Sequence, residues 1–562
     1  MNAVEQVAPG VLAETTSGET WRRALDWQIA VVLAIVVFFG AIRWRLADMP
    51  LERDEGEYAY AGQLILQGIP PYQLAYNMKL PGTYAAYAVI LAVFGQTARG
   101  IHIGLLLINS VSILLLYAIA ARLLGALGGV VASASYAFLS TQPGVYGFAA
   151  HATHFVVLAA LIGVILLLRA EETRRLPLFF CSGFAFGIAF LMKQPGFLFG
   201  AFGFFYLAVR CRTRGWPTGA SKEIREWKRW VTQLGVFVLA TAAPFALTCV
   251  LLYHAGVFKK FWFWTFSYAR QYATTVSWSA GWELFKASAL YILGFTTPGL
   301  WIVALLGVFA VFLSPNLRQH RVFLFGLTIF SFAAVCPGLH FRPHYFILFL
   351  PAVALLIAAG VTSSADWLTA RYGSCWLRSL PVLVFAAAWA LAVLHNAQFY
   401  FRLSPLQATR VCYSVNPFPE AAQVAEYLRQ HTAPTDTIMV FGSEPEIYFE
   451  AQRHSASGYI YSYSLGEDQA YWPIMQKQMM EEVEANRPAY VVLVNISFSW
   501  LLDPRSPQAV AIRTSIKQYV SSGFEQVGMV DVAEPESRYF WGEEAQGHHH
   551  PGYELLIFKR KD

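Results

Sequence analysis

Residues 51–60 read LERDEGEYAY, so that four carboxylates fall within six positions of a strongly apolar chain. The four are Glu52, Asp54, Glu55 and Glu57, and they follow directly on the first long apolar run. Charge runs of this kind usually lie on a solvated surface. Their place beside a long apolar run also fits a site at the boundary of a membrane.

The rest of the sequence supports the second interpretation. Of the 562 residues, 56% are hydrophobic and 14% are charged, and apolar runs of membrane-spanning length succeed one another over most of the chain. The composition therefore predicts a polytopic α-helical membrane protein. The net charge of +6 comes from Lys and Arg in short loops between apolar runs, where they report topology and do not indicate nucleic-acid binding.

The basic loops also predict an orientation. We expect about eleven spans between residues 27 and 398, among them stretches near 102–122, 126–141 and 287–313. Every basic cluster faces the cytoplasm only if the short apolar stretch 81–95 does not cross the membrane. This stretch, and a second helix with an apolar face at Tyr58–Ile65, are predicted to lie along the membrane surface. The loop 45–101 and its acids then face outward.

Three parts follow from this division. Residues 1–26 are expected to be a cytoplasmic N-terminal segment, and residues 27–400 a transmembrane domain. Residues 401–562 form an extracytoplasmic domain in which helical and strand patterns alternate, as in a small α/β domain. Its helices are predicted near 416–431, 469–486 and 506–521, and its strands near 437–442, 489–495, 524–530 and 553–559. The whole is an integral, multi-pass protein of a plasma (inner) membrane.

A carboxylate at an outward membrane boundary suits one kind of reaction. A polyprenyl-phosphate sugar presents its anomeric carbon at this depth, and its leaving group is a phosphate. Displacement then needs one carboxylate to take the proton of an acceptor hydroxyl and cations to hold the phosphate, without a general acid. Asp54 or Glu55 can be the base. The outward-facing cationic candidates beside apolar segments are Lys79, Lys193, Arg342 and His344.

Two segments carry a resemblance to a known family. RDEGEYAYAGQLILQGIPPY (53–72), followed by NMKLPGTY (77–84), resembles the first outer loop of the GT-C superfamily of polyprenyl-phosphate-dependent glycosyltransferases. The closer match is to the branch with bacterial aminoarabinose transferases, protein O-mannosyltransferases and the lipopolysaccharide-core transferases of rhizobia. HFRPHYFILFLP (340–351) is similar to a late outer-loop segment of many members. The resemblance implies a GT-C-like helical domain.

The resemblance also implies roles for individual residues. An Asp, often followed by Glu, begins this loop and acts as catalytic base or as part of a metal-binding pair, so these roles fall on Asp54 and Glu55. A divalent cation, Mg²⁺ or Mn²⁺, is allowed but not required. The family's Lys-Pro-Pro element binds the lipid phosphate, and Lys79 in KLPG takes that place. The other substrate-binding candidates are Lys193, Arg342, His344, Tyr345, Glu57 and Tyr58.

Some positions depart from the family or have two interpretations. Leu80 replaces the first proline, and Met78 stands where the aminoarabinose branch has Glu, which argues against that sugar. His151 and His154, three residues apart, could bind a metal, but without a third clear ligand a structural role is favoured. Glu444 and Glu446 either reach the roof of the site or cap a helix. The aromatic run FWFWTFSYARQY (261–272) could stack on sugars or anchor the chain at the interface.

These observations predict a membrane glycosyltransferase. It would transfer a hexosyl or pentosyl group from a polyprenyl-phosphate donor to a lipid, glycan or protein acceptor on the outer side, and the resemblance implies that the transfer proceeds with inversion. The alternative is a transporter or flippase of lipid-linked sugars. Transporters place ionisable groups at mid-membrane and show paired halves with broken helices, whereas this chain concentrates its acids in one loop. A ligand-binding sensor would leave the loop acids without a role.

Overall fold

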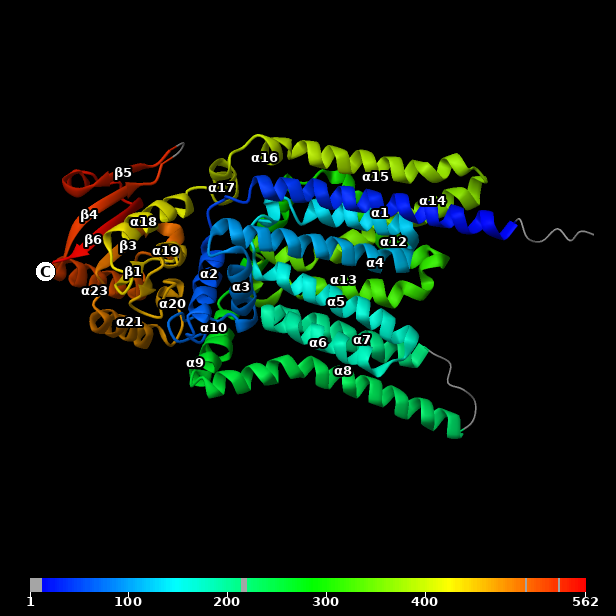
Figure 1. The fold of residues 1–562 in the computed structure, drawn as a ribbon, viewed down its shortest axis with the longest axis horizontal. Coiled ribbons are helices and arrows are strands. Elements are labelled where there is room, and N and C mark those ends of the chain that lie inside the picture. The colour runs from blue at the N-terminus through cyan, green and yellow to red at the C-terminus, as the bar shows by residue number, and fades with distance from the viewer. Residues whose placement is uncertain (1–12, 214–219, 501–502, 534–535, 562) are drawn as a thin grey trace, which may run out of the picture.

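The computed structural model describes residues 13–213, 220–500, 503–533 and 536–561. Long helices run side by side, and a small sheet domain lies at one end of this bundle (Figure 1). Two helices of the first loop, α2 (Arg53–Leu66) and α3 (Pro81–Phe94), lie across that end, between the bundle and the sheet (Figure 1). Residues 1–12 of the expected N-terminal segment lie outside the described residues, and α1 begins within the rest of that segment.

Eleven described helices make up the bundle. They are α1 (Ala13–Arg45), α4 (Ala98–Leu139), α5 (Ala152–Thr173), α6 (Leu176–Met192), α7 (Phe197–Thr213), α8 (Ala220–His254), α11 (Trp278–Gly294), α12 (Pro298–Leu313), α13 (Arg321–Ala333), α14 (Leu350–Tyr372) and α15 (Cys375–His395). Among the described residues, six helices are long and apolar enough to cross a membrane, and one bent pair would make a seventh span. The multi-span helical class is confirmed, and the count of about eleven spans stays a prediction.

One expected span is not a continuous helix. The stretch expected to span near 287–313 is broken, because α11 and α12 meet at an angle of 117°. Thr297 precedes Pro298 and has an extended backbone (φ −81°, ψ 147°), since the proline ring disfavours the helical region for the residue before it. A second break falls at Gly125 inside α4, where a φ of 78° separates the stretches expected at 102–122 and 126–141.

Short helices cover the end of the bundle that carries the sheet domain. α9 (Phe258–Trp262), the π-helical turn η3 (Phe263–Tyr268) and α10 (Ala269–Tyr272) follow α8. The 3₁₀ turns at this end are η1 (Pro143–Val145), η2 (Gln194–Gly196), η5 (Pro337–Leu339) and η6 (Pro343–Leu348), whereas η4 (Pro315–His320) joins α12 to α13 at the opposite end. Glu52 and Glu55 form a reciprocal capping box at the start of α2, so two of the four acids satisfy backbone N–H groups there.

The sheet domain has six strands in the order β2-β1-β3-β6-β4-β5. β1 pairs in parallel with β2 and β3, and the remaining pairs are antiparallel. The strands are β1 (Thr437–Phe441), β2 (His454–Ser455), β3 (Tyr490–Ile496), β4 (Phe524–Asp531), β5 (Arg538–Trp541) and β6 (Tyr553–Arg560). The helices are α18 (Phe418–His431), α19 (Glu446–Ala451), α20 (Tyr463–Gly466), α21 (Trp472–Asn486), α22 (Ser497–Trp500) and α23 (Pro507–Gly523), with the 3₁₀ turn η7 (Gly542–Gly547). Two short helices, α16 (Ala397–Phe401) and α17 (Pro405–Tyr413), connect α15 to this domain and pack on the bundle. All seven elements predicted in this domain are present.

The first loop and the sheet domain share one apolar core. Buried residues of α2 and α3 belong to the same cluster as β1, β3 and α19. The rings of Tyr60 and Tyr448 pack with centroids 5.3 Å apart across this junction. Gly56 lies so close to α19 that a Cβ atom there would be 2.5 Å from the backbone nitrogen of Glu446. The sheet domain is therefore packed directly on the helix that carries the acidic cluster.

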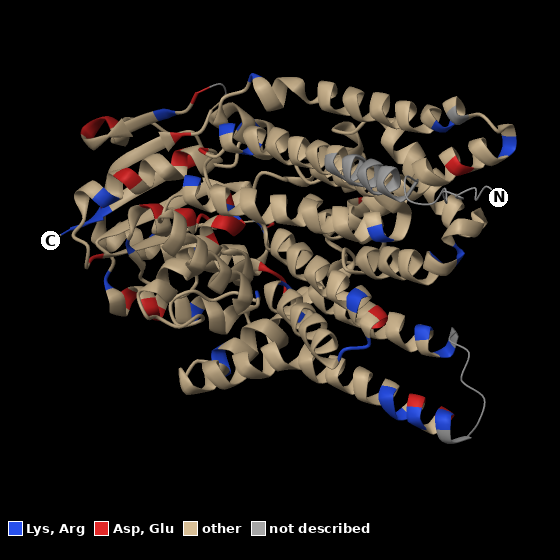
Figure 2. Ribbon diagram, turned by 45° about the vertical axis from the view of Figure 1, so that its right-hand side comes forward, with Lys and Arg blue, Asp and Glu red and all other residues tan. Residues whose placement is uncertain are grey.

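Charge divides the molecule along its length. Acidic side chains gather at the sheet domain and the first loop, whereas many of the Lys and Arg residues lie at the opposite end of the bundle (Figure 2). This distribution has the form that the positive-inside rule describes for a membrane protein.

Candidate active site

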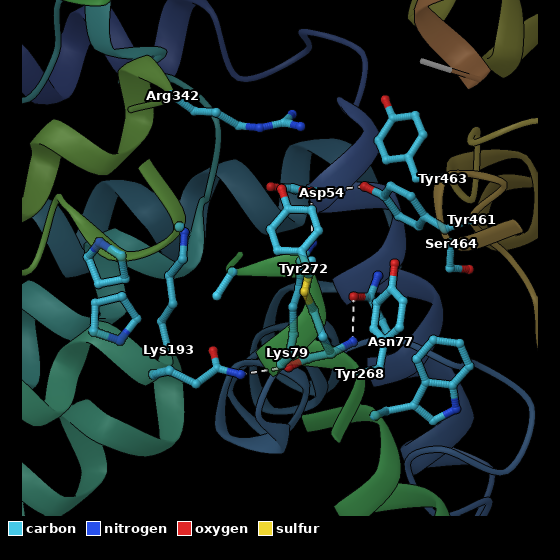
Figure 3. A pocket seen from close by; sticks show the side chains of 18 of the residues that line it. Asp54, Asn77, Lys79, Lys193, Tyr268, Tyr272, Arg342, Tyr461, Tyr463 and Ser464 are labelled. Atoms are coloured by element: carbon cyan, nitrogen blue, oxygen red, sulfur yellow. Dashed lines mark hydrogen bonds and ion pairs between the residues drawn. The ribbon is translucent and has the colours of Figure 1, made fainter. Parts of the chain in front are cut away.

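A cavity of about 210 Å³ lies where the bundle, the first loop and the sheet domain meet (Figure 3). Five of the predicted site residues line it: Asp54, Lys79, Lys193, Arg342 and Tyr345. The other lining residues are Tyr76, Asn77, Met78, Gln194, Pro195, Trp264, Tyr268, Ala269, Tyr272, Ala273, Ala334, Pro337, Gly338, Tyr461, Tyr463, Ser464 and Glu467. The cavity thus collects residues that are up to about four hundred positions apart in the chain.

Asp54 projects into this cavity from the first turn of α2. One carboxylate oxygen, Oδ1, accepts a hydrogen bond from Lys79 Nζ at 2.7 Å and another from the Tyr461 hydroxyl at 2.8 Å. Burial disfavours its ionised form, but the Lys79 ammonium and nearby imidazoles outweigh this and hold the pKa of Asp54 well below its usual value. Asp54 is therefore an oriented, ionised carboxylate with access to the cavity.

Lys79 is held between two carboxylates. Besides Asp54 it contacts Glu57 Oε2 at 2.6 Å, and its ammonium lies 4.6 Å from the centre of the Tyr58 ring. Glu57 is fully buried and also accepts hydrogen bonds from Asn77 and Tyr84, at 2.8 and 2.5 Å. Glu57 and Tyr58 therefore surround Lys79 and do not themselves line the cavity.

Glu55 has a different environment although it is next to Asp54 in sequence. Its Oε1 accepts a hydrogen bond from the backbone N–H of Ala150 at 2.5 Å and lies 3.1 Å from His102 Nε2. Burial raises the pKa of Glu55, but His102 and the Ala150 N–H outweigh it and lower that pKa overall. Glu55 is buried and ties α2 to the bundle. The structure thus brings Asp54, but not Glu55, to the cavity.

The segment 340–351 and the residue after α6 supply the side of the cavity that the helical bundle forms. Tyr345 and Arg342 come from the turn before α14, and Lys193 follows the last residue of α6. The Lys193 ammonium lies 3.8 Å from the centre of the Tyr345 ring. Among the described residues, no carboxylate lies within ion-pair distance of Lys193 or Arg342. Burial lowers the pKa of Lys193 to about 7, so a bound anion would favour its charged form, and both side chains can therefore face an anionic ligand.

Asp54 also belongs to a group of side chains that could hold a metal ion. One donor atom each from Asp54, His151 and His344 lies within 4.8 Å of the others, and the two imidazole rings stack at 4.0 Å. Neither ring nitrogen of His151 has a hydrogen bond within the described part of the chain. His154 does not join this group. His151 is therefore a candidate metal ligand, whereas His154 is a buried residue outside the group.

The sheet-domain side of the cavity was not predicted from the sequence. Tyr461, Tyr463, Ser464 and Glu467 all come from the segment around α20. The density of hydroxyl groups in GYIYSYSLGED (458–468) is the signal that could have pointed to it. Tyr268 donates a hydrogen bond to Glu467, which links this segment to the π-helical turn η3. Trp264 and Tyr272 of the aromatic run 261–272 also line the cavity.

Glu444 and Glu446 do not line the cavity. Glu444 Oε1 accepts a hydrogen bond from Arg53 Nη2 at 3.1 Å, and Arg53 Nε also donates to the Ser443 carbonyl at 2.6 Å. Glu446 is the first residue of α19, and burial together with Glu444 raises its pKa. These contacts join the start of α2 to the sheet domain. Glu446 lies in the first turn of α19, but its side chain makes no capping hydrogen bond to the described residues there.

Comparison with known proteins identifies the architecture. ArnT from Cupriavidus metallidurans bound to undecaprenyl phosphate aligns over 95% of this chain and 98% of its own length, with a TM-score of 0.57 and 13% identity. The apo state of the same protein gives a TM-score of 0.55 at 14% identity. This chain has the GT-C fold. The architecture expected from the outer-loop resemblance is thus confirmed.

The GT-C chain also matches one family at the sequence level. The model for dolichyl-phosphate-mannose-protein mannosyltransferases covers residues 79–218, which include Lys79 and Lys193 but not Asp54 or Arg342. No curated protein matches the sequence. The oligosaccharyltransferase of Archaeoglobus fulgidus in its apo form aligns over 91% of this chain and 74% of its own, with a TM-score of 0.49 and 13% identity.

Proposed function

We propose that this protein is an inverting glycosyltransferase that moves a sugar from a polyprenyl-phosphate donor to an acceptor on the outer side of the membrane. The observation that carries the proposal is the placement of Asp54, an ionised carboxylate, in one cavity with Lys193 and Arg342. The family match at residues 79–218 and the undecaprenyl phosphate named for the ArnT structure support the choice of donor.

In the proposed reaction Asp54 is the general base. Its carboxylate takes the proton of an acceptor hydroxyl while the hydroxyl oxygen forms a bond to the anomeric carbon and the bond from that carbon to the phosphate oxygen breaks. The electron pair of the broken bond leaves on the phosphate. Lys193 and Arg342 stabilise the charge that develops there, so no general acid is required.

Lys79 has a second role in this scheme. The resemblance assigns it to the lipid phosphate, but both of its close partners are carboxylates, Asp54 and Glu57. We propose that Lys79 keeps Asp54 ionised and oriented, and that it reaches a phosphate only by giving up one of these partners. His344 and Tyr345 lie next to the base and to Lys193, where they can shape the phosphate end.

A divalent cation fits the same site. Asp54, His151 and His344 would hold it, and two imidazole nitrogens suit Mn²⁺ better than Mg²⁺, which prefers oxygen ligands. When bound, the ion would neutralise part of the phosphate charge. The test is metal analysis of purified wild type and His344→Ala, with transfer assayed after EDTA and after return of Mn²⁺ or Mg²⁺. Metal in the wild type that His344→Ala lacks supports this site.

The setting of the reaction follows from the charge distribution. The basic end of the bundle, opposite the sheet domain, is proposed to face the cytoplasm (Figure 2), and α1 begins at that end (Figure 1). Residues 401–562 and the cavity then lie on the outer side of an inner membrane. A glycan, lipid or protein acceptor would approach from there.

The test is sugar transfer from a panel of radiolabelled polyprenyl-phosphate sugars, with donor binding measured in parallel. Asp54→Asn is expected to lose about 10²- to 10⁴-fold in turnover, as for removal of a general base, while it keeps donor binding. Asp48→Asn is the matched control, because Asp48 is exposed and pairs with Arg99 on the surface. Full activity of Asp54→Asn, or no turnover of any donor, would favour a flippase of lipid-linked sugars.

A further inference from the structure

The two sides of the cavity are chemically unlike. In Figure 3, Lys193 and Arg342 lie on one side of Asp54, and Tyr461, Tyr463 and Ser464 lie on the other. The first side belongs to the helical bundle and is cationic. The second side belongs to the sheet domain and offers aromatic rings, hydroxyl groups and the carboxyl group of Glu467. Asp54 thus stands between a charged wall and a hydroxyl-rich wall.

In-line displacement assigns the two walls to different substrates. The attacking oxygen and the leaving phosphate lie on opposite faces of the anomeric carbon, and the base must contact the attacking hydroxyl. If Lys193 and Arg342 hold the phosphate, the acceptor enters from the side of Tyr461. The hydrogen bond from the Tyr461 hydroxyl to Asp54 Oδ1, at 2.8 Å, joins this wall directly to the base.

We propose that residues 461–467 of the sheet domain bind the acceptor and that the acceptor is a polyhydroxylated carbohydrate. This proposal rests on the proposed transferase function. Tyr rings combine an apolar face with a polar edge, which suits the mixed surface of a sugar ring. The Ser464 hydroxyl can donate and accept, and Glu467 can accept from sugar hydroxyls as it already does from Tyr268.

The backbone of this wall argues against an extended peptide as acceptor. Residues Tyr463–Gly466 form helix α20, so part of this wall is helical and presents no strand edge. An extended peptide is commonly recognised by pairing with an exposed strand edge. This wall can instead bind an acceptor through the hydroxyl and carboxyl groups of its side chains, which form hydrogen bonds with the hydroxyl groups of a carbohydrate.

The experiment measures acceptor KM and donor KM separately for the full-length protein. Acceptors are a lipid-anchored branched oligosaccharide and a Ser/Thr-containing peptide, used with whichever donor the wild type accepts. Ser464→Ala and Glu467→Gln are expected to raise the oligosaccharide KM by about tenfold each while donor KM stays unchanged. Glu481→Gln on α21, an exposed residue outside the cavity, is the matched control.

The outcomes separate this inference from the proposed function. Transfer to the oligosaccharide with a raised acceptor KM in both variants supports the inference. Transfer only to the peptide, or an unchanged acceptor KM in two variants that keep the wild-type melting temperature, overturns the inference alone. Absence of transfer by the wild type from every donor overturns the proposed function, and the inference falls with it.

Discussion

The cavity has a bundle wall, with Lys193 and Arg342, and a sheet wall, with residues 461–467. The two walls differ in charge and in how each contacts Asp54. On the bundle wall, Lys193 and Arg342 face the cavity, and among the described residues they have no carboxylate partner. On the sheet wall, Tyr461 contacts Asp54 directly, and α19 packs against α2 beside Gly56. The difference suggests that changes on the two walls should affect different kinetic constants although both surround one carboxylate.

The largest expected effect of this kind is on the bundle wall. Arg342→Ala removes a guanidinium that can fork onto phosphate oxygens, so kcat/KM for the donor should fall by about 10- to 100-fold, the range expected for a hydrogen bond to a charged group. Acceptor KM should not change. Steady-state transfer assays at varied donor and varied acceptor concentrations separate the two constants.

Arg99→Ala is the control for this prediction, because Arg99 is an arginine on the surface that pairs with Asp48. If Arg342→Ala instead raises acceptor KM and leaves the donor unaffected, the assignment of the two walls is reversed.

The next prediction concerns the attachment of the sheet wall. In Gly56→Ala the new methyl group would lie 2.5 Å from the Glu446 backbone nitrogen, so α2 and α19 must move apart. Overpacking of this kind costs about 1–3 kcal/mol of unfolding free energy, and Tm of the detergent-solubilised protein should fall. Gly40→Ala is the matched control, since nothing lies within 4 Å of a Cβ atom at that position.

Gly56→Ala also sharpens the comparison of the walls. Because α19 and the sheet wall share one apolar core, we expect a shift of α19 to displace the wall, so acceptor KM should rise in this variant while donor binding at Lys193 and Arg342 is retained. Equal loss of donor and acceptor binding would show that the two walls do not respond separately.

Much of the fold follows from local patterns. Apolar runs of spanning length, the alternation of helix and strand after residue 404 and the short stretch 81–95 could each be interpreted without tertiary information. The break between α11 and α12 could also have been predicted, because Thr297 precedes a proline, but the long apolar run favoured a single span. The span count depends on where lipid meets the helices, which sequence hydropathy does not fix.

The candidate site also contains residues that the sequence could predict and residues that it could not. Asp54, Lys79 and Arg342 lie in motifs that a family resemblance can carry, and all three line the cavity. Glu55 shares the motif, yet its position on α2 turns it toward His102 and Ala150, and only packing decides this. Tyr461 lies 407 positions from Asp54, and no local pattern connects them. The sheet wall therefore had to come from the structure.

A smaller effect is expected from the bond between Tyr461 and the base. Tyr461→Phe removes the hydroxyl that donates to Asp54 Oδ1, while Lys79 still holds that oxygen at 2.7 Å. The turnover number kcat should fall by about tenfold, the lower range for a hydrogen bond to a charged group, with little change in donor KM. Tyr459→Phe is the matched control, because Tyr459 does not line the cavity and its hydroxyl donates to Gln478 Oε1 at 3.0 Å. Equal losses in both variants would assign the effect to the packing of this segment and not to the bond with Asp54.

The smallest predicted effect is a pH dependence confined to the sheet wall. Burial raises the pKa of Glu467 to about 7, although Tyr268 and Arg342 oppose the shift. As pH rises from 6 to 8 the carboxyl group loses its proton and becomes a stronger acceptor for sugar hydroxyls, so acceptor KM should fall a few-fold. At pH 6 the wild type should approach Glu467→Gln, whose acceptor KM should not follow this titration.

The raised pKa of Glu467 also affects stability: rising pH should strengthen acceptor binding but destabilise the folded protein. Unfolded Glu467 ionises near its ordinary pKa of about 4.5, while the folded carboxyl keeps its proton up to about 7. Between these values the unfolded state binds fewer protons, so raising the pH lowers the wild-type Tm more than that of Glu467→Gln. A KM titration near pH 7 that persists in Glu467→Gln would mean that another group sets it, and the sheet wall would then act by shape and not by this carboxyl group.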